Sequence, residues 1–229
     1  MTSIAQNIKI IEERVDASAK KTGRRCSDIK IVAVSKTVDA QAVAQARQAG
    51  IRDFGENRVQ EYLKKREVLG DDIAWHIIGP LQRNKVKYIL DGVYLLHSLD
   101  RVTLAHELNL QCEKNGTELN ALVQLNIAKE PTKSGVYEED LERFLEQLSD
   151  MRSIHIKGLM AIPPAVCDAD DNRPYFEKMR MLYERFKNVF PGAGFEFLSM
   201  GMSDDFEAAI EEGSNVVRIG TAVFGARSN

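Results

Sequence analysis

The sequence has few cysteines and no long apolar run. The three cysteines, Cys26, Cys112 and Cys167, are scattered, form no CxxC pair and fit no disulfide framework. Such a set is typical of the reduced thiols of a cytoplasmic protein. No segment approaches the roughly 18 uninterrupted apolar residues of a membrane-spanning helix. Acidic side chains also stand in the opening segment, where a signal peptide would be apolar. We therefore expect a cytoplasmic protein without membrane association.

The sequence also lacks a strong excess of either charge. It has 31 Lys and Arg against 34 Asp and Glu, a formal net charge of −3 and a pI of about 5.9. This balance gives no electrostatic reason to expect binding of nucleic acid. Metal-ligand spacing such as HExxH is absent, so we expect no metal site from the four histidines. They are His76, His97, His106 and His155.

No linker-like or low-complexity segment divides the chain, so residues 1–229 are expected to form a single domain. Short β-like runs alternate with helical patterns along its whole length. Eight such runs are found: 31–35, 53–57, 74–79, 93–99, 121–126, 156–161, 195–200 and 215–220. Helical patterns between them cover 57–69, 101–114, 138–151 and 174–190. A further helix opens the chain, because Ile4, Ile8, Ile11 and Val15 form one apolar stripe.

Strands that alternate with helices favour parallel pairing through right-handed crossovers. Eight strands, each followed by a helix, predict an α/β fold, namely a closed (β/α)8 TIM-type barrel with an extra N-terminal helix. An open doubly wound sheet is disfavoured, because no strand is followed by GxGxxG. Only residues 221–229 follow the last strand, and the N-terminal helix is a candidate to cover the gap that this short tail leaves.

Lys36 directly follows the first strand and is the sharpest candidate for chemistry. Barrel active sites lie at the C-terminal ends of the strands, so the lysine stem is expected to start in the barrel mouth. Burial disfavours the ammonium form, and a neutral amine forms a Schiff base with an aldehyde. The alternative is a lysine that extends from the strand end to solvent.

Small and hydroxylated residues follow strands seven and eight. Barrels commonly bind phosphate at these two loops. Backbone N–H groups approach an anion closely where side chains are small, and hydroxyls add donors. Candidates for phosphate contact are Ser199, Gly201, Ser203, Gly220 and Thr221, and Met200 in the same segment is a further candidate for cofactor binding. We place Ser199, Gly220 and Thr221 before Ser203, because Ser203 precedes two aspartates and resembles a helix N-cap.

An aldehyde-reactive lysine and a phosphate cup that flank one ligand suit pyridoxal 5′-phosphate, which carries both groups. Arg218 lies two residues before Gly220 and therefore on the same face of its strand. If that face is the lumen, the guanidinium can meet the pyridine nitrogen and keep it unprotonated. An unprotonated ring is a poorer electron sink, so holding the cofactor is favoured over carbanion chemistry.

Several longer segments form one further pattern. They are AVSKT (33–37), FGENRVQE (54–61), WHIIGPLQRNK (75–85), SLDR (98–101), VQLNIAKEPTKSG (123–135), GLMAIPP (158–164) and 198–227. Together, in order and spacing, they resemble the YggS/PROSC-type pyridoxal-phosphate-binding proteins. The resemblance implies a barrel like the N-terminal domain of alanine racemase and a role in vitamin B6 homeostasis. It implies a Schiff base on Lys36, phosphate contacts from Ser199, Gly220 and Thr221, and Arg218 at the pyridine nitrogen, with Asn57 near the cofactor.

The leading function is a carrier that stores the cofactor or delivers it to apo-enzymes. Two enzyme functions, a racemase and an aldolase, remain as the second and third possibilities. A racemase needs two opposed acid/base groups, and Lys36 could be one of them. In alanine racemases the opposing tyrosine comes from a second domain, which this chain does not contain, so a monomer is the default expectation. The third possibility is a Schiff-base aldolase acting on a phosphorylated sugar. The tyrosines available are Tyr62, Tyr88, Tyr94, Tyr137, Tyr175 and Tyr183.

Other conspicuous side chains are expected to serve the fold. The basic residues around 20–25 suit a solvated helix C-terminus that stops at Gly23. Those at 64–66 suit a solvated helix face. His76 and His97 are expected to be packed and hydrogen-bonded inside the barrel, and Trp75, which alternates with His76, to pack between barrel and helix.

Overall fold

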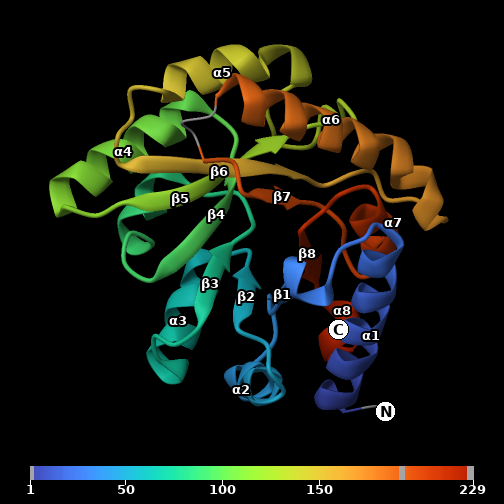
Figure 1. The fold of residues 1–229 in the computed structure, drawn as a ribbon. Helices are drawn as coiled ribbons and strands as arrows, with labels where there is room; N and C mark the ends of the chain where they lie inside the picture. The colour runs from blue at the N-terminus through green and yellow to red at the C-terminus, as the bar shows by residue number, and fades with distance from the viewer. Residues whose placement is uncertain (1–2, 191–193, 226–229) are drawn as a thin grey trace.

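The computed structural model describes residues 3–190 and 194–225. Its eight strands form a closed barrel in chain order, each parallel to the next, and β1 closes the barrel by pairing with β8 (Figure 1). The strands are β1 (Lys30–Val34), β2 (Asp53–Glu56), β3 (Ala74–Ile77), β4 (Val93–Leu99), β5 (Leu119–Leu125), β6 (Ile154–Ala161), β7 (Phe197–Ser199) and β8 (Val216–Ile219). The predicted barrel is confirmed, and each of the eight predicted runs overlaps a strand, although β1, β5 and β6 begin one or two residues before their runs.

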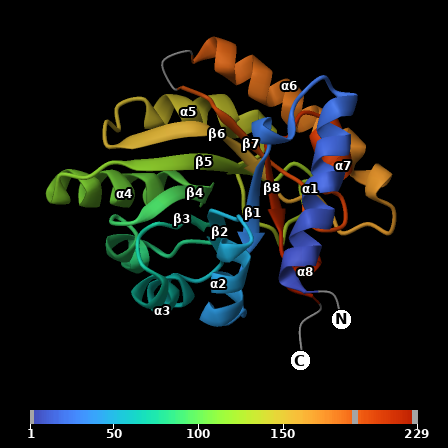
Figure 2. The ribbon, with the colours of Figure 1, turned by 60° about the horizontal axis from the view of Figure 1, so that its bottom comes forward.

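Helices surround the barrel (Figures 1 and 2). They are α1 (Ile4–Lys21), α2 (Ala40–Gln48), α3 (Val59–Leu69), α4 (Val102–Asn115), α5 (Leu141–Leu148), α6 (Arg173–Val189), α7 (Phe206–Glu211) and α8 (Thr221–Phe224). Short 3-10 helices are η1 (Cys26–Asp28), η2 (Arg83–Tyr88), η3 (Glu138–Asp140) and η4 (Ala169–Asn172). The expectation of a helix after every strand is wrong after β3, where no α-helix follows. Only the 3-10 helix η2 connects β3 to β4.

Helix α1 covers the last part of the barrel. It lies beside α7 and α8 (Figures 1 and 2), with the apolar stripe Ile8, Ile11 and Val15 buried. A capping box formed by Ser3 and Gln6 defines its start. The Asn7 amide donates to the Val223 carbonyl at 2.9 Å, which ties α1 to α8. The predicted N-terminal helix therefore does fill the place that the short tail leaves.

The barrel interior is separate from the core between barrel and helices. Alternate strand residues point inward and form a small buried apolar cluster: Val32, Leu95, Leu122, Met160, Phe197 and Val216. Buried polar side chains, including His76, His97 and Arg218, lie among the same strands. On the outside, Trp75 packs against Phe54 and against Tyr62 of α3. The predictions for Trp75 and for the two histidines are confirmed.

The basic cluster at residues 20–25 is less exposed to solvent than the sequence suggests. Lys20 and Lys21 are exposed at the end of α1, before Gly23 at φ 71°. Arg24, however, turns back and donates to carbonyls at the end of α7, those of Ile210 and, at 2.8 Å, of Ser214. Its guanidinium therefore ties the end of α1 to the end of α7 and the segment that follows it.

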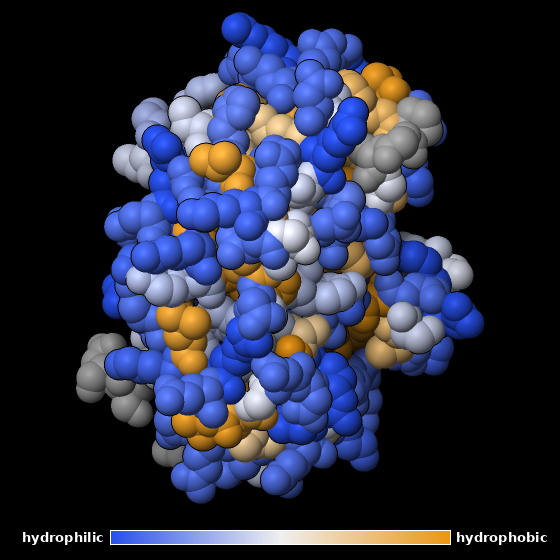
Figure 3. All heavy atoms as spheres, turned by 90° about the vertical axis from the view of Figure 1, so that its left-hand side faces the viewer, coloured by the Kyte–Doolittle hydropathy of each residue, from blue (hydrophilic) through white to orange (hydrophobic). Residues whose placement is uncertain are grey.

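The side of the molecule shown in Figure 3 is mostly hydrophilic, with apolar side chains in small separate groups. Within residues 3–190 and 194–225, no helix combines the length and the apolar character needed to cross a membrane. Cys26, Cys112 and Cys167 are all free thiols.

Candidate functional site

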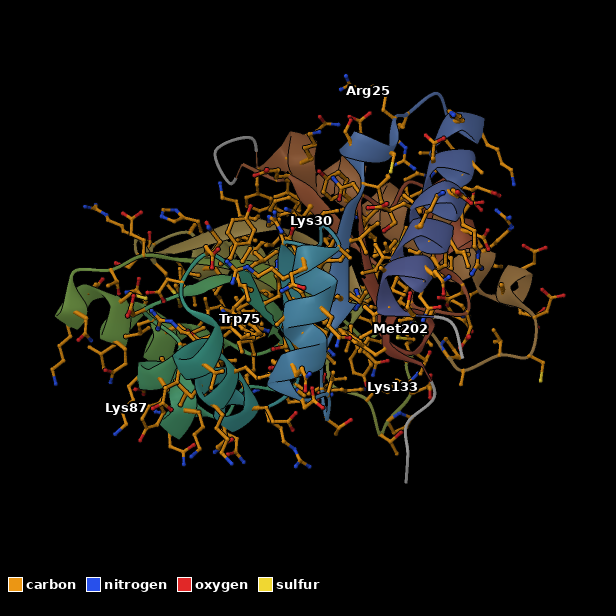
Figure 4. The ribbon with its side chains drawn as sticks, turned by 90° about the horizontal axis from the view of Figure 1, so that it is seen from below. Arg25, Lys30, Trp75, Lys87, Lys133 and Met202 are labelled. Carbon is orange, nitrogen blue, oxygen red and sulfur yellow. The ribbon has the colours of Figure 1, made fainter. Side chains whose placement is uncertain are left out.

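A cavity of about 430 Å³ opens at the C-terminal ends of the strands. This volume lies within the range of small-molecule sites in proteins. Lys133 and Met202, which both line the cavity, lie at one end of the barrel, and Lys30 at the N-terminal end of β1 lies toward the other (Figure 4). The cavity is therefore in the mouth where (β/α)8 barrels bind their ligands.

Six of the predicted site residues line this one cavity. They are Lys36, Asn57, Ser203, Arg218, Gly220 and Thr221, contributed by β1, β2, β8 and α8, by the residues just after these strands or by the loop after β7. The structure does not bring the other three to the cavity. Ser199 and Met200 are fully buried, and Gly201, at φ 90°, packs on Phe206 and Ala209 of α7.

Lys36 lies in a turn that several contacts hold in place. The Val38 N–H donates to the Ser35 carbonyl at 3.0 Å. Thr37, between them, adopts φ 64°, a left-handed conformation that a β-branched residue rarely adopts. The Glu61 carboxylate of α3 accepts from the Thr37 N–H at 2.8 Å. Because such strain persists only where the surroundings over-determine it, the direction in which Lys36 leaves the strand is fixed.

A buried ion pair lies beneath this turn. The Lys65 ammonium contacts a Glu56 carboxylate oxygen at 2.6 Å and donates to the Ser35 carbonyl at 2.6 Å. The Ser35 hydroxyl donates to the same Glu56 oxygen at 2.6 Å. Burial raises the pKa of Glu56, although the bonds from Lys65 and Ser35 oppose it. Lys65 is only 7% exposed, so the expectation that residues 64–66 form a solvated face is wrong for this residue.

The position of Asn57 is set by a close contact between the segments that follow β2 and β3. A Cβ added to Gly79 would lie 2.5 Å from the Asn57 carbonyl oxygen, so only glycine fits there. The Ser98 hydroxyl donates to the Gly79 carbonyl at 2.7 Å and fixes this segment from the side of β4. Gly79 is thus a functional residue that sequence reasoning did not single out, and the GP pair after β3 was its only signal.

Arg218 brings a permanent positive charge into the cavity wall. Its side chain is 4% exposed and donates to the Ser199 hydroxyl at 2.6 Å and to the Ala161 carbonyl at 2.9 Å. Burial lowers the pKa of the guanidinium to about 10. The group is therefore still a cation at neutral pH, and its orientation is set by two acceptors deeper in the barrel.

The start of α8 forms the part of the cavity best suited to an anion. The N–H groups of Gly220 and Ala222 point at the Ser203 hydroxyl, at 3.2 and 3.4 Å. Ser203 lines the cavity, whereas Ser199 does not. The sequence favours Ser199 over Ser203 for phosphate contact, and this geometry does not support that order. Of the two aspartates that follow Ser203, Asp205 is engaged elsewhere, because its carboxylate accepts from the Met202 N–H and from the Asn172 amide. Asp204 lines the cavity beside Ser203.

The loop after β5 forms a wall that the sequence did not predict. Asn126, at the end of β5, donates to the carbonyls of Glu130 and Lys133 and accepts from the Glu130 N–H. The loop thereby presents Thr132, Lys133 and Ser134 to the cavity. The segment 123–135 was among the motifs that carry the family resemblance, but no role was assigned to its residues. Within the described part of the chain, no group of three or more His, Cys, Asp or Glu side chains could hold a metal ion.

Comparison with known proteins agrees with the fold. Residues 3–228 match the family model described as "Alanine racemase, N-terminal domain". The "Pyridoxal phosphate homeostasis protein" of Aquifex aeolicus is 42% identical over 223 residues, which cover 97% of each chain. The protein of the same description from Escherichia coli K12 is 38% identical over 99% of this chain and 98% of that relative.

A solved structure gives the same relationship. PipY of Synechococcus elongatus, in a structure with PLP bound, is 32% identical and superposes with a TM-score of 0.84 over 97% of this chain and 100% of its own. Alanine racemase of Clostridium difficile, at 17% identity and a TM-score of 0.70, shares the fold. The fold and site thus define a barrel of the alanine racemase N-terminal type. Within that class, the chain belongs to the family of pyridoxal phosphate homeostasis proteins.

Proposed function

We propose that this protein binds pyridoxal 5′-phosphate and takes part in vitamin B6 homeostasis. One observation carries the proposal: Lys36, Arg218 and the N–H groups at the start of α8 share a single cavity. Amine, fixed cation and anion-binding amides are the three partners that the aldehyde, the pyridine ring and the phosphate need. PipY, a relative of nearly the same length, binds this cofactor.

Each residue then has one task. Lys36 holds the aldehyde carbon as a Schiff base, and the ion pair below its turn keeps the amine aimed into the mouth. Arg218 faces the pyridine nitrogen as a cation and keeps that nitrogen unprotonated. The Gly220 and Thr221 backbone and the Ser203 hydroxyl hold the phosphate, and Asn57 lines the side of the ring. When bound, the cofactor supplies an electrophilic carbon, and the arginine limits its use as an electron sink.

The cavity favours holding over turnover. None of the six tyrosines, all within the described residues, lines the cavity, so the tyrosine acid/base that a racemase uses has no counterpart there. We propose that the protein is a cytoplasmic monomer that stores the cofactor or delivers it to apo-enzymes. Alanine incubated with the loaded protein in deuterium oxide should show no exchange of the α-hydrogen above the rate with free cofactor. Robust exchange would establish the racemase alternative instead.

The covalent attachment has a direct test. The purified protein, reconstituted with pyridoxal phosphate, should be yellow, and borohydride should fix the mass of the cofactor on the peptide that contains Lys36. Lys36→Ala should take up no borohydride-stable cofactor, while Lys64→Ala, on the exposed face of α3, should behave like the unchanged protein. A colourless protein that cannot be reconstituted, or a label on another lysine, would contradict the proposal.

The orientation of the cofactor is tested at the phosphate end. Ser203→Ala removes one hydroxyl from the anion site, and a hydrogen bond to a charged group contributes about 1.5–3 kcal/mol. We expect the dissociation constant for pyridoxal phosphate to rise about 10- to 100-fold, measured by equilibrium dialysis. Thr132→Ala, in the loop after β5, should leave it within about two-fold. A larger rise of the dissociation constant in Thr132→Ala than in Ser203→Ala would place the phosphate beside the loop after β5.

A further inference from the structure

The barrel interior contains a continuous line of hydrogen bonds that leads away from the cavity. Arg218 Nη1 donates to Ser199 Oγ at 2.6 Å, and Ser199 Oγ lies 3.0 Å from His97 Nδ1. His97 Nε2 lies 2.8 Å from His76 Nδ1, and His76 Nε2 lies 2.9 Å from Asp53 Oδ1. The line therefore runs through strands β8, β7, β4, β3 and β2 to the opposite mouth. We call these five residues, from Arg218 to Asp53, the interior relay.

The interior relay ends in a second cavity. Asp53 and Lys30 line an open hollow at the N-terminal ends of the strands, and the Lys30 ammonium contacts Asp53 Oδ1 at 3.0 Å. Between the two mouths, His76, His97 and Ser199 have no exposed surface. The relay is thus the polar connection between a solvent-facing ion pair and the cation in the cofactor pocket.

Both ends of the relay fix the direction of every bond in it. The guanidinium of Arg218 only donates, and the ionised carboxylate of Asp53 only accepts. His76 must therefore carry its proton on Nε2, which leaves Nδ1 to accept from His97 Nε2. His97 Nδ1 is then an acceptor, and the Ser199 hydroxyl donates a hydrogen bond to it. Both histidines are neutral in the same tautomer, and every donor points from Arg218 toward Asp53.

The charges around the relay agree with this assignment. Burial lowers the pKa of His76, and it lowers that of His97 strongly, with the neighbouring Arg218 adding to the effect. Burial opposes ionisation of Asp53, but the bond from His76 and the charge of Lys30 outweigh it and lower the pKa of Asp53. Within the described residues, the charged groups of the relay and beside it are Lys30 from β1, Asp53 from β2, Arg218 from β8 and Asp205, whose negative charge acts on Arg218. The Tyr94 ring contacts His76 and the Lys30 ammonium.

We propose that Asp53 is a positioning residue for the cofactor pocket, which acts on Arg218 through the single direction that it imposes on His76, His97 and Ser199. The N-terminal mouth of the barrel then sets how Arg218 meets the ligand at the C-terminal mouth. The role in ligand binding rests on the proposed function, whereas the direction of the relay is a property of the protein alone.

The direction is tested in the protein without cofactor. Long-range ¹H–¹⁵N spectra of the imidazole rings should show His76 and His97 neutral at pH 7.5 and both protonated on Nε2. An asparagine at position 53 can both donate and accept, so Asp53→Asn should give a mixture of tautomers at His97, which does not touch residue 53. Asp28→Asn, at the same mouth but bonded to Arg25, should leave the spectrum unchanged. His97 protonated on Nδ1 in the unchanged protein, or no tautomer change in Asp53→Asn, would overturn the proposal.

The link to the pocket is tested with the cofactor. Asp53→Asn and Ser199→Ala should each raise the dissociation constant of pyridoxal phosphate about 3- to 10-fold and shift its visible absorption band, because Arg218 loses its fixed orientation. Ser199→Thr, which keeps the hydroxyl, and Asp28→Asn should do neither. An Asp53→Asn protein that binds like Asp28→Asn would overturn the proposal. If the unchanged protein bound no cofactor at all, the proposed function would fail, and the tautomer measurement would still decide the relay.

Discussion

Lys65→Met is expected to lower the free energy of unfolding by about 3–5 kcal/mol, the usual result of removing one partner of a buried ion pair. Methionine fills a similar volume, so the loss comes from Glu56, whose carboxylate remains buried without its counter-ion. One oxygen of Glu56 already has no partner within the described structure. A protein of this size should melt roughly 6–20 °C lower.

The pH dependence of this loss identifies its cause. The folded-state pKa of Glu56 is raised, so the folded protein holds that proton more tightly than the unfolded chain. The deficit of Lys65→Met should therefore be small at acid pH and should grow as pH rises through the folded-state pKa. Lys64→Met, on the exposed side of the same helix, should melt like the unchanged protein, and Glu56→Gln combined with Lys65→Met should recover part of the loss. An equal deficit at all pH values would assign the effect to packing alone.

The second large effect concerns acid stability. His76 and His97 are neutral and fully buried, with folded-state pKa values below the ordinary 6.5. Below pH 6.5 the unfolded chain binds two protons that the folded chain refuses, so stability present at higher pH is lost as pH falls. Each group contributes at most about 1.4 kcal/mol per pH unit, so we expect a loss of about 2–3 kcal/mol between pH 7.5 and 5.5.

Urea unfolding at several pH values measures this loss. Ordinary carboxylates titrate mainly below pH 5. Glu56, whose folded-state pKa is raised, changes stability in the opposite direction, so a loss of stability on acidification in this window comes from the histidines. His97→Gln should reduce the pH slope by about half, whatever its effect on stability at pH 7.5. His155→Gln, at an exposed site on β6 that bonds Glu118, should keep the full slope. A free energy of unfolding that stays constant from pH 7.5 to 5.5 would show that the buried histidines accept protons in the folded state.

The barrel was predictable because its signals are local. Most strands are short runs of apolar and β-branched residues, and each long helix carries its own apolar stripe, such as Ile8, Ile11 and Val15 of α1. The helix of the third crossover was expected only from the repeat of strand and helix, because no helical pattern was found between 79 and 93. The structure has the 3-10 helix η2 (Arg83–Tyr88) there.

The site was predictable only in part, because burial of polar groups depends on contacts far apart in the chain. Lys36 and Arg218 follow from their positions at strand ends. Lys65 could not be recognised, because it stands between Lys64 and Arg66 in a triplet typical of a solvated face, and Glu56 is its partner only in the folded barrel. Ser199 and Ser203 are alike in sequence, and the structure separates them by turning one hydroxyl to Arg218 and the other to the N–H groups of α8.

The pairing of β1 with β8 has a consequence for the empty protein. An open sheet leaves two rows of unpaired N–H and C=O groups, which can recruit strands from other chains and start aggregation. Here the eight strands of the described structure form a closed ring, so neither edge exists. The ring is formed by backbone bonds and by the apolar interior, without any contribution from the mouth where a ligand would lie. The closed barrel therefore offers no strand edge to other chains, whether or not a ligand lies in its mouth.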